Sequence, residues 1–392
     1  MTGVVLYECL TQSSSGHHVE KAEIWVYEAA AFFDEVTLVT FATPLFALPG
    51  NARVISCGPL PTWCSSPKTT HLRGFRQAWL NFRGWRTALY HAHLLNIPAL
   101  SLTTLAPGIL LASLLVRRKS PIGHIVMAIP GGAESKRPLS HCLRFMVRVL
   151  AKRGYSFFCN TEIIASTLSK LVAPHHKSIH VTRDPVQLLP APDLSPLGSQ
   201  GPLRLLIPGD DRADRTGIAT ITRCTALPAG TQLLIHVPGA SPTRVAEIRT
   251  ILQGSHASME FSIEDRYLSR EELYALYLSA DAVLLAYSAN QQMGSGNLLI
   301  ALACKRPVLA SGFPAFTEME SEVGKLGESF DGNQPETLIS SVRRLRSWST
   351  DDWKQFDLHC DAARSLFCSR ATATTTFNCL LGDSQADTLP SV

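Results

Sequence analysis

A short loop of small and polar residues is the part of the chain best suited to hold an anion. Gly294-Ser-Gly-Asn297 follows a buried strand predicted for residues 282–286 and opens an apolar helix predicted for residues 298–304. The first N–H groups of a helix lack intrahelical partners and lie at the positive end of the helix dipole, so they bind phosphate groups well. We therefore expect a diphosphate to contact Gly294, Ser295, Gly296, Asn297 and Leu298.

Two arginines, Arg212 and Arg215, lie in a second loop between Gly209 and Gly217, directly after a strand predicted for residues 203–207. A guanidinium group forms charge-assisted hydrogen bonds with phosphate oxygens and can neutralise a departing diphosphate. Solvated loop arginines without a ligand are the alternative, and the flanking glycines favour the ligand-binding interpretation.

Four histidines are expected at or just beyond the carboxyl ends of strands, where open parallel sheets bind their ligands. His17 and His18 follow a strand predicted for residues 3–10, and His91 and His93 end a strand predicted for residues 88–93. An ordinary loop histidine is the alternative for each of them.

Apolar strands alternate with helical patterns along the whole chain, which is typical of parallel α/β sheets. The other strands are predicted at residues 36–41, 52–56, 123–129, 156–160 and 178–182, then at 232–237, 259–263 and 307–310. Residues 187–202 contain four prolines and two glycines and are predicted to link two series. We expect an N-terminal domain at 1–190, a C-terminal domain at 203–360, a helix at 361–381 that packs back on the first domain, and a flexible tail at 382–392.

The composition is that of a globular protein, with 45% hydrophobic and 17% charged residues among 392 and a net charge of only +4. Ten cysteines show neither a C-x-x-C pair nor zinc spacing, so we expect reduced thiols and no metal. No signal peptide is visible, which favours the cytoplasm. Pro107 and Gly108 interrupt the apolar stretch at 99–116, so a buried helix is a better interpretation than a membrane span.

Two predicted helices, at 72–89 and 137–152, combine arginines with aromatic or aliphatic residues. A solvated face over a core stripe explains both. Docking to an anionic membrane surface, as a peripheral protein on its inner face, is the alternative. No nucleic-acid recognition module is evident, so nucleic acid is not an expected partner.

The segment from 271 to 314 resembles the donor-binding part of glycosyltransferase family 4. That family shows a helix, "ADxxLxPy", a glycine loop and "LEAxAxGxPVxA", and Leu299-Ile-Ala-Leu-Ala-Cys-Lys-Arg-Pro-Val-Leu-Ala310 follows this order. Residues 206–217 resemble the family's "GR….KG" loop, and Ser15-Gly16-His17-His18 resembles its N-terminal glycine loop.

The resemblance implies a GT-B fold, with two Rossmann-like domains facing an interdomain cleft. It implies a retaining, metal-independent glycosyltransferase that uses a UDP- or GDP-linked sugar, needs no cofactor and acts on a glycan or lipid-linked acceptor in cell-surface polysaccharide synthesis. Arg215, Arg212 and His17 would then be catalytic. The donor would contact Gly16, Gly209, Gln292 and residues 294–298, and the acceptor would contact His18, His91 and His93.

Two departures from the family pattern keep an alternative open. The family carries a pair of glutamates at the positions of Gln292 and Ile300, and isoleucine cannot hold a ribose. The alternative is a non-catalytic sugar-binding or scaffold subunit of a polysaccharide assembly complex. A GT-B epimerase is disfavoured because its acidic and histidine cluster is missing from the donor loop.

Replacing Arg215 with alanine should weaken nucleoside diphosphate binding by about 30–100-fold, because one charge-assisted interaction with the diphosphate is lost. Calorimetric titration of wild type and the variant measures this. Binding that is indifferent to Arg215→Ala and to Arg212→Ala would show that neither arginine contacts the diphosphate.

Overall fold

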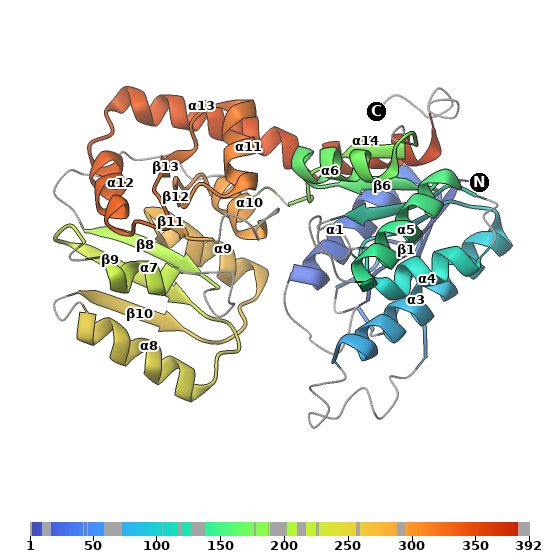
Figure 1. Cartoon of the computed structure of the whole chain (residues 1–392), viewed down its shortest axis with the longest axis horizontal. Helices are drawn as coiled ribbons and strands as arrows, with labels where there is room; N and C mark the ends of the chain where they lie inside the picture. The colour runs from blue at the N-terminus through green and yellow to red at the C-terminus, as the bar shows by residue number, and fades with distance from the viewer. Residues whose placement is uncertain are drawn as a thin grey trace. The chain divides into compact units, whose positions relative to one another are not determined.

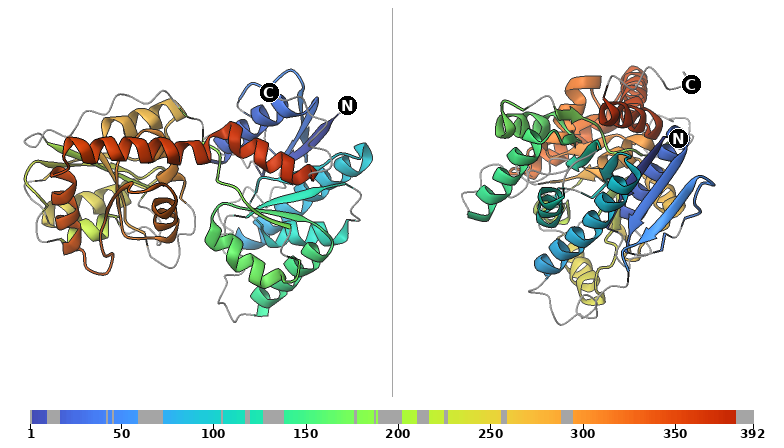
Figure 2. Two further views of the ribbon diagram at one scale, coloured as in Figure 1. Left: turned by 90° about the horizontal axis from the view of Figure 1, so that it is seen from above. Right: turned by 90° about the vertical axis from the view of Figure 1, so that its right-hand side faces the viewer.

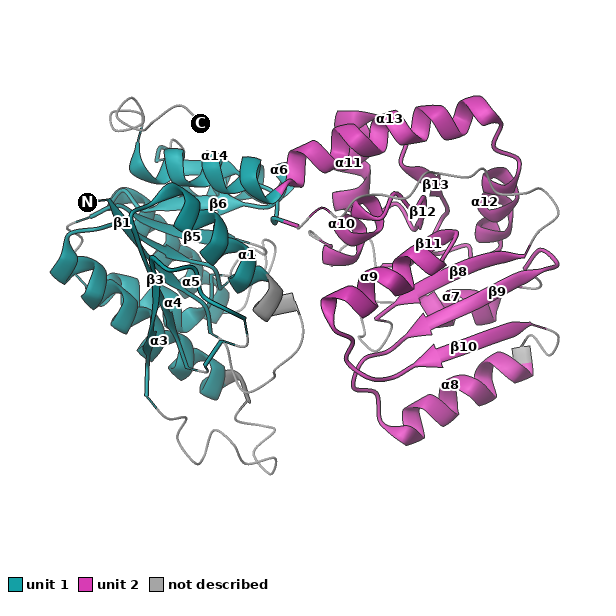
Figure 3. Cartoon of the chain, turned by 180° about the vertical axis from the view of Figure 1, so that it is seen from behind, with its two compact units in different colours: residues 1–185, 369–392 teal, residues 186–368 magenta. Residues whose placement is uncertain are grey.

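The computed structural model divides the chain into two compact units, formed by residues 1–185 with 369–392 and by residues 186–368 (Figures 1 and 3). Each unit is an α/β structure. The structure describes residues 2–9, 17–41, 43–44, 46–58, 73–103, 105–116, 120–126, 138–175, 178–186, 188, 202–209, 217–224, 227–255, 259–287 and 295–382, without the side chains of 17–20, 73–74 and 255.

Unit 1 contains a seven-stranded parallel sheet in the order β3-β2-β1-β4-β5-β6-β7. Its five central strands are almost entirely buried and apolar, as expected for a sheet that is covered on both faces, and the edge strands β3 and β7 are largely half-buried. The strands are β1 (Gly3–Tyr7), β2 (Glu35–Thr40), β3 (Ala52–Ser56), β4 (Ala99–Ser101), β5 (Ile122–Val126), β6 (Ser156–Cys159) and β7 (Ile179–Val181).

Helices cover the two faces of this sheet in separate groups (Figure 2). On one face, α1 (His17–Phe32) packs beside α14 (Ser369–Leu381), and the rings of Trp25 and Phe377 lie 5.6 Å apart. On the other face α3 (Arg73–Leu95), α4 (Pro107–Leu115), α5 (Pro138–Lys152) and α6 (Glu162–Val172) follow one another. The chain therefore completes the core of unit 1 with its last helix.

Two predictions in this unit are wrong. Residues 88–93 belong to α3 and not to a strand, because Trp85, Leu89 and Ala92 recur at helical spacing on its buried side. The apolar stretch from 99 to 116 is not one buried helix but strand β4 followed by α4, which Pro107 begins. Among the helices that the structure describes, none is long and apolar enough to span a bilayer.

Unit 2 contains a six-stranded parallel sheet in the order β10-β9-β8-β11-β12-β13. Its strands are β8 (Leu203–Pro208), β9 (Thr231–His236), β10 (Glu260–Glu264), β11 (Ala282–Leu285), β12 (Val308–Ala310) and β13 (Gly327–Ser329). Its helices are α7 (Gly217–Arg223), α8 (Pro242–Ser255), α9 (Arg270–Ser279), α10 (Gly296–Ala303), α11 (Pro314–Val323), α12 (Glu336–Arg346) and α13 (Thr350–Phe367). Strand β13 has no counterpart among the predicted strands.

The helix expected at 361–381 is divided between the two units. Residues 361–367 form the last part of α13, whose Cys360, Ala363 and Phe367 are buried in the core of unit 2. Residues 369–381 form α14 in unit 1. A backbone hydrogen bond from Val186 N–H to the Phe367 carbonyl, 3.1 Å long, lies where the chain enters and leaves unit 2.

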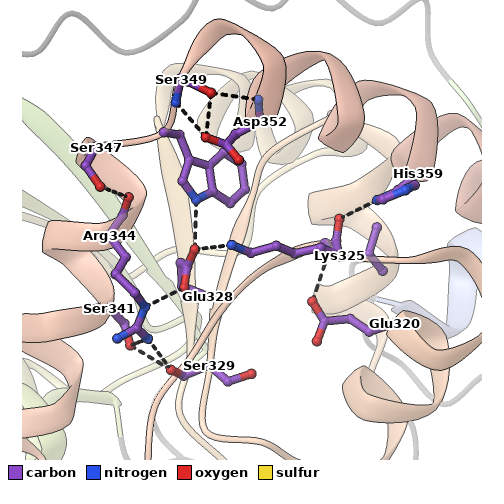
Figure 4. A network of polar contacts seen from close by, with 12 residues as sticks. Glu320, Lys325, Glu328, Ser329, Ser341, Arg344, Ser347, Ser349, Asp352 and His359 are labelled. Carbon is purple, nitrogen blue, oxygen red and sulfur yellow. Dashed lines mark hydrogen bonds and ion pairs between the residues drawn. The ribbon is translucent and has the colours of Figure 1, made fainter.

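A buried carboxylate fastens edge strand β13 to the helices beside it (Figure 4). Glu328, whose side chain is 6% exposed, accepts hydrogen bonds from Arg344 Nε at 2.7 Å, Trp348 Nε1 at 2.7 Å and Lys325 Nζ. Burial alone would raise the pKa of Glu328, but these three donors lower it overall. The network is structural, because the charge of Glu328 is satisfied within the protein.

A buried histidine lies on β5 beneath the helices α3 and α4. His124 is fully buried, its ring is parallel to that of Tyr155 at 5.6 Å, and its Nε2 lies 3.4 Å from Ser113 Oγ. Ser113 Oγ also accepts from Trp85 Nε1 at 2.8 Å. Burial lowers the pKa of His124 to about 3, so the folded protein keeps the neutral imidazole.

The unfolded chain binds a proton on His124 below about pH 6.5, whereas the folded chain does not until about pH 3. The stabilisation that neutral His124 contributes to the folded state is therefore complete above pH 6.5 and is lost as the pH falls. We expect the free energy of unfolding to drop by roughly 2–3 kcal/mol between pH 6.5 and 4.5 from this group. Urea titrations at several pH values should show that the free energy of unfolding of His124→Phe depends less steeply on pH than that of wild type. His175→Gln, which removes an exposed histidine, should keep the wild-type pH dependence. Equal slopes for wild type and His124→Phe would contradict this.

Candidate functional site

The topology of unit 2 marks one place on its sheet for a ligand. Strands β8 and β11 are neighbours, but the chain continues from β8 toward β9 on one side and from β11 toward β12 on the other. In open parallel sheets a crevice forms beyond the carboxyl ends of two such strands, where the helices leave in opposite directions. The candidate site is therefore the region that follows Pro208 on β8 and Leu285 on β11.

Hydrogen bonds join the start of α10 to both strand ends at this place. Ser295 caps the helix, since its Oγ accepts from Leu298 N–H at 3.1 Å and lies 3.2 Å from the Tyr287 hydroxyl. Asn297 Nδ2 donates to the Pro208 carbonyl and to the Tyr287 hydroxyl, both at 3.2 Å. The start of α10 is thereby held against the ends of β8 and β11.

Tyr287, which follows β11, is also held by residues that follow β12. Tyr287 N–H donates to Ser311 Oγ at 2.9 Å, Ser311 Oγ donates to the Tyr287 carbonyl at 2.7 Å, and the ring of Tyr287 packs 4.7 Å from that of Phe313. Tyr287 is only 4% exposed. Packing therefore fixes the position of Tyr287, and its hydroxyl is held where it contacts Ser295 and Asn297 at the start of α10.

The start of α10 favours an anion. Its first turn carries no acidic residue, and within the described part of the chain the N–H groups of Gly296 and Asn297 donate to no partner. Unpaired N–H groups at the positive end of a helix dipole are what a phosphate group requires. Leu298 differs from this expectation, because its N–H is taken by Ser295 Oγ and its side chain is buried in the core.

Of the residues predicted in the two loops, the structure describes Gly209 and residues 295–298. Gly209 directly follows β8, has a positive φ of 68° that suits glycine, and donates its N–H to the His236 carbonyl. It is therefore adjacent in sequence to Pro208, which Asn297 contacts. Gly16, Arg212, Arg215, Gln292 and Gly294 lie outside the described residues, as do the side chains of His17 and His18, which begin α1.

His91 and His93 were expected at the end of a strand, and this is wrong. Both belong to the last turns of α3, which leads into the beginning of β4 through only three residues. They therefore lie near the amino-terminal edge of the sheet, whereas ligands of such sheets bind at the carboxyl edge. The position at a strand end, from which their contact with an acceptor was expected, is therefore not the one they occupy.

Unit 1 has the same change of direction, between β1 and β4, and it brings together residues that the sequence analysis missed. Glu8 and Cys9 follow β1, and Thr103 follows β4. Thr103 Oγ1 donates to Glu8 Oε1 at 3.3 Å and accepts from Cys9 N–H at 3.0 Å. Glu8 is 1% exposed, and burial raises the pKa of Cys9 to about 12, so this thiol stays protonated. The visible sign of this cluster was Glu8, an acidic residue within the otherwise largely apolar run predicted as a strand at residues 3–10.

A buried ion pair lies at the same edge of the unit 1 sheet. Lys21 Nζ, on α1, is 3.0 Å from Asp184 Oδ1 beyond β7, and the two side chains are 3% and 8% exposed. Asn160 Nδ2, beyond β6, donates to the other oxygen of Asp184 at 3.4 Å. Each charge is compensated by a neighbour, so the pair fastens α1 to the sheet.

Ile300 occupies the position at which family 4 carries its second glutamate. Its side chain is 7% exposed and belongs to the hydrophobic cluster that also contains Leu299, Phe313 and Phe356. The helix α10 is buried over all of its later residues, from Leu298 to Ala303. Position 300 therefore serves the core of unit 2.

Lys305 stands where the family pattern has its glycine, directly after α10. It adopts a left-handed conformation with a φ of 50°, which glycine accepts more readily than lysine. Lys305 Nζ pairs with Asp357 at 2.6 Å and with Asp361 at 2.9 Å, both on α13. A lysine at this position has a less favourable backbone conformation than a glycine would have, but it forms two ion pairs that hold α13 against α10.

Comparison with known proteins connects the chain to glycosyltransferases through structure alone. No family model matches the chain, and no curated protein matches it in sequence. Three similar solved structures are HepE from Anabaena in complex with UDP and glucose (TM-score 0.65, 13% identity, 97% of this chain and 99% of that chain), sucrose-phosphate synthase from Thermosynechococcus elongatus (0.69, 16%, 96% and 98%) and the UDP-forming α,α-trehalose-phosphate synthase from Burkholderia xenovorans (0.68, 12%, 98% and 100%).

These neighbours are GT-B glycosyltransferases, and the match covers nearly the whole of each chain. The predicted fold class is therefore confirmed: the chain is an α/β protein with the GT-B fold, built from two Rossmann-like domains. Within the described residues, no three His, Cys, Asp or Glu side chains are grouped as metal ligands.

Ile300→Glu should destabilise unit 2, because it places a carboxylate in a hydrophobic core without a partner. We expect a loss of roughly 3 kcal/mol or more in the free energy of unfolding at pH 7, with partial recovery at pH 4.5 as the carboxylate is protonated. Ile300→Leu, which keeps the volume, should cost less than about 1.5 kcal/mol. Chemical denaturation of both variants measures this, and an unchanged stability of Ile300→Glu would mean that position 300 opens toward a ligand.

Proposed function

We propose that the protein is a glycosyltransferase that binds the diphosphate of a nucleotide-sugar donor at the start of α10. The observation that carries this proposal is the arrangement of Ser295, Asn297 and Tyr287 beside the carboxyl ends of β8 and β11, which leaves two helix N–H groups available. Similar structures contain UDP and UDP-glucose, which favours a UDP-linked sugar over a GDP-linked one.

The described residues would position the donor more than they would react with it. Asn297 and Tyr287 fix the direction in which the N–H groups of Gly296 and Asn297 point. During transfer the bond between the anomeric carbon and the diphosphate oxygen breaks, and negative charge develops on that oxygen. The start of α10, with Arg212 and Arg215 from the loop after β8, would stabilise this charge without reorganising.

The finer assignments rest on the sequence resemblance. They are a retaining outcome, a reaction without metal or cofactor, His17 as a catalytic residue, and a glycan or lipid-linked saccharide as the acceptor in polysaccharide synthesis. Retention is supported by the likeness of residues 299–310 to family 4. Because His91 and His93 lie near the amino-terminal edge of the sheet, the candidates for contact with the acceptor are instead the residues that follow β1 and β4.

A non-catalytic sugar-binding subunit remains the second candidate, and Ile300 is the observation that favours it. A core residue stands where the family holds the ribose, so the charge on the diphosphate has to supply more of the donor's affinity. Calorimetry with UDP, GDP and ADP, together with a donor-hydrolysis assay over a panel of nucleotide sugars, separates the two. Binding with hydrolysis supports the transferase, and binding without hydrolysis supports the subunit.

Asn297→Ala removes the hydrogen bonds to the Pro208 carbonyl and the Tyr287 hydroxyl and frees the start of α10. We expect UDP affinity to fall by about 5–10-fold, which corresponds to the loss of roughly one net hydrogen bond. The matched control is Asn333→Ala, an exposed asparagine in a turn after β13 of the same unit, which should bind UDP as wild type does. Wild-type protein that binds none of UDP, GDP and ADP would refute the proposed function.

A further inference from the structure

The charges of this chain are distributed very unevenly. Between Glu35 and Glu162 the sequence contains fifteen lysines and arginines but a single acidic residue, Glu134, so residues 36–161 carry a formal charge of +14. The whole chain carries only +4, so the remaining residues carry −10. A basic segment of this length inside unit 1 indicates a polyanionic partner for that unit.

The helices α3, α4 and α5 lie within this segment, and their sequences contain no Asp or Glu. They lie side by side on one face of the unit 1 sheet (Figures 1 and 3). Large apolar side chains stand on their outer sides, away from the sheet: Phe75, Tyr90 and Leu94 on α3, Leu111 and Leu115 on α4, and Leu139 and Phe145 on α5. We call this surface the α3–α5 face.

The apolar residues of the α3–α5 face are exposed to an unusual extent. Leu115 is 68% exposed, Leu139 is 65% exposed and Phe145 is 62% exposed. Single exposed leucines are ordinary on protein surfaces, but several large ones on adjacent helices mark an interaction site. Their spacing fits this on α4, where Leu111 and Leu115 are one turn apart.

Cations accompany these apolar residues on the same side. On α5, Arg148 and Lys152 follow Phe145 at spacings of three and four residues along the exposed side, and Arg86 is exposed between Phe75 and Tyr90 on α3. Arg148 Nε donates to the Leu171 carbonyl at the end of α6, which holds this side chain in place. Lysine and arginine beside exposed leucine and phenylalanine form the pattern of a surface that lies in a lipid headgroup layer.

This surface differs from the two basic and aromatic stripes anticipated in the sequence. Trp85 is fully buried against Tyr7 and His124, and Leu143 and Leu150 face the core. Helix α4, which carries no charge and lies between the two basic helices, adds Leu111 and Leu115 to the apolar residues of the face.

We propose that the α3–α5 face docks unit 1 onto a bilayer of anionic phospholipid as a peripheral contact. The leucine and phenylalanine tips enter the headgroup layer, and Arg86, Arg148 and Lys152 pair with lipid phosphates. A nucleic acid would satisfy the cations, but it would leave Leu115 and Phe145 in water. This docking does not depend on sugar transfer, and it would bring a lipid-linked acceptor and the enzyme to one surface.

Sedimentation of the full chain with vesicles tests this, using phosphatidylcholine alone and phosphatidylcholine with phosphatidylglycerol, without donor. We expect binding only to the anionic vesicles, weakening as salt is raised. Leu115→Ser with Phe145→Ser should lower partitioning by at least about tenfold, and Arg86→Glu with Lys152→Glu by at least about 25-fold. The matched controls lie in unit 2: Leu358→Ser, on α13 and 63% exposed, and Arg343→Glu, exposed on α12, should bind as wild type does.

Absence of binding to anionic vesicles at low salt overturns the proposal, and so does an equal loss in the unit 2 controls. One further result would overturn the proposal. If the chain binds a polyanion such as heparin but no vesicles, and if Leu115→Ser with Phe145→Ser does not weaken that binding, the face belongs to another class of partner. UDP titration of the same preparations keeps the outcomes separate. A protein that binds UDP but no vesicle retains the proposed transferase function and loses only this surface.

Discussion

The handedness of the strand–helix–strand connection is the constraint on which the rest of this structure depends. A right-handed crossover between parallel strands obliges helices that follow strands added in opposite directions to lie on opposite faces of the sheet. At β1 and β4, and again at β8 and β11, neighbouring strands therefore end without a shared helix above them. Both units leave polar groups at this place, Glu8 and Thr103 in one and Tyr287 and Asn297 in the other.

Side-chain hydrogen bonds give the second of these places its definition. The topology alone brings the ends of β8 and β11 together, but many proteins share that arrangement without a common activity. Tyr287 is bonded through its backbone to Ser311 and through its hydroxyl to Ser295 and Asn297. One aromatic residue thus connects β11, β12 and α10, so the unpaired N–H groups of the helix are held in a fixed direction.

Much of the fold could be predicted from the sequence, and the failures have physical causes. Strand β3 was predicted at the residues where it occurs, because its β-branched residues Val54 and Ile55 stand between the turn residues Gly50 and Gly58. Strand β4 has three buried residues beside an apolar helix, and periodicity cannot separate such short pieces. The start of α10 was anticipated from its glycines, whereas Tyr287 could not be, since its role comes from Ser311, 24 residues away. The burial of Ile300 could not be predicted either, because it depends on how α13 packs in the core of unit 2.

The order of the two units along the chain has a consequence for how the protein is made. Unit 2 is inserted within unit 1, because residues 186–368 separate the first seven strands from α14. Phe377 and Leu380 of α14 belong to the same core as Val4 and Leu6 of the first strand. During synthesis from the amino terminus, the inserted unit has all of its residues available before the surrounding one does. The half of the molecule that leaves the ribosome first is therefore the last whose core can close.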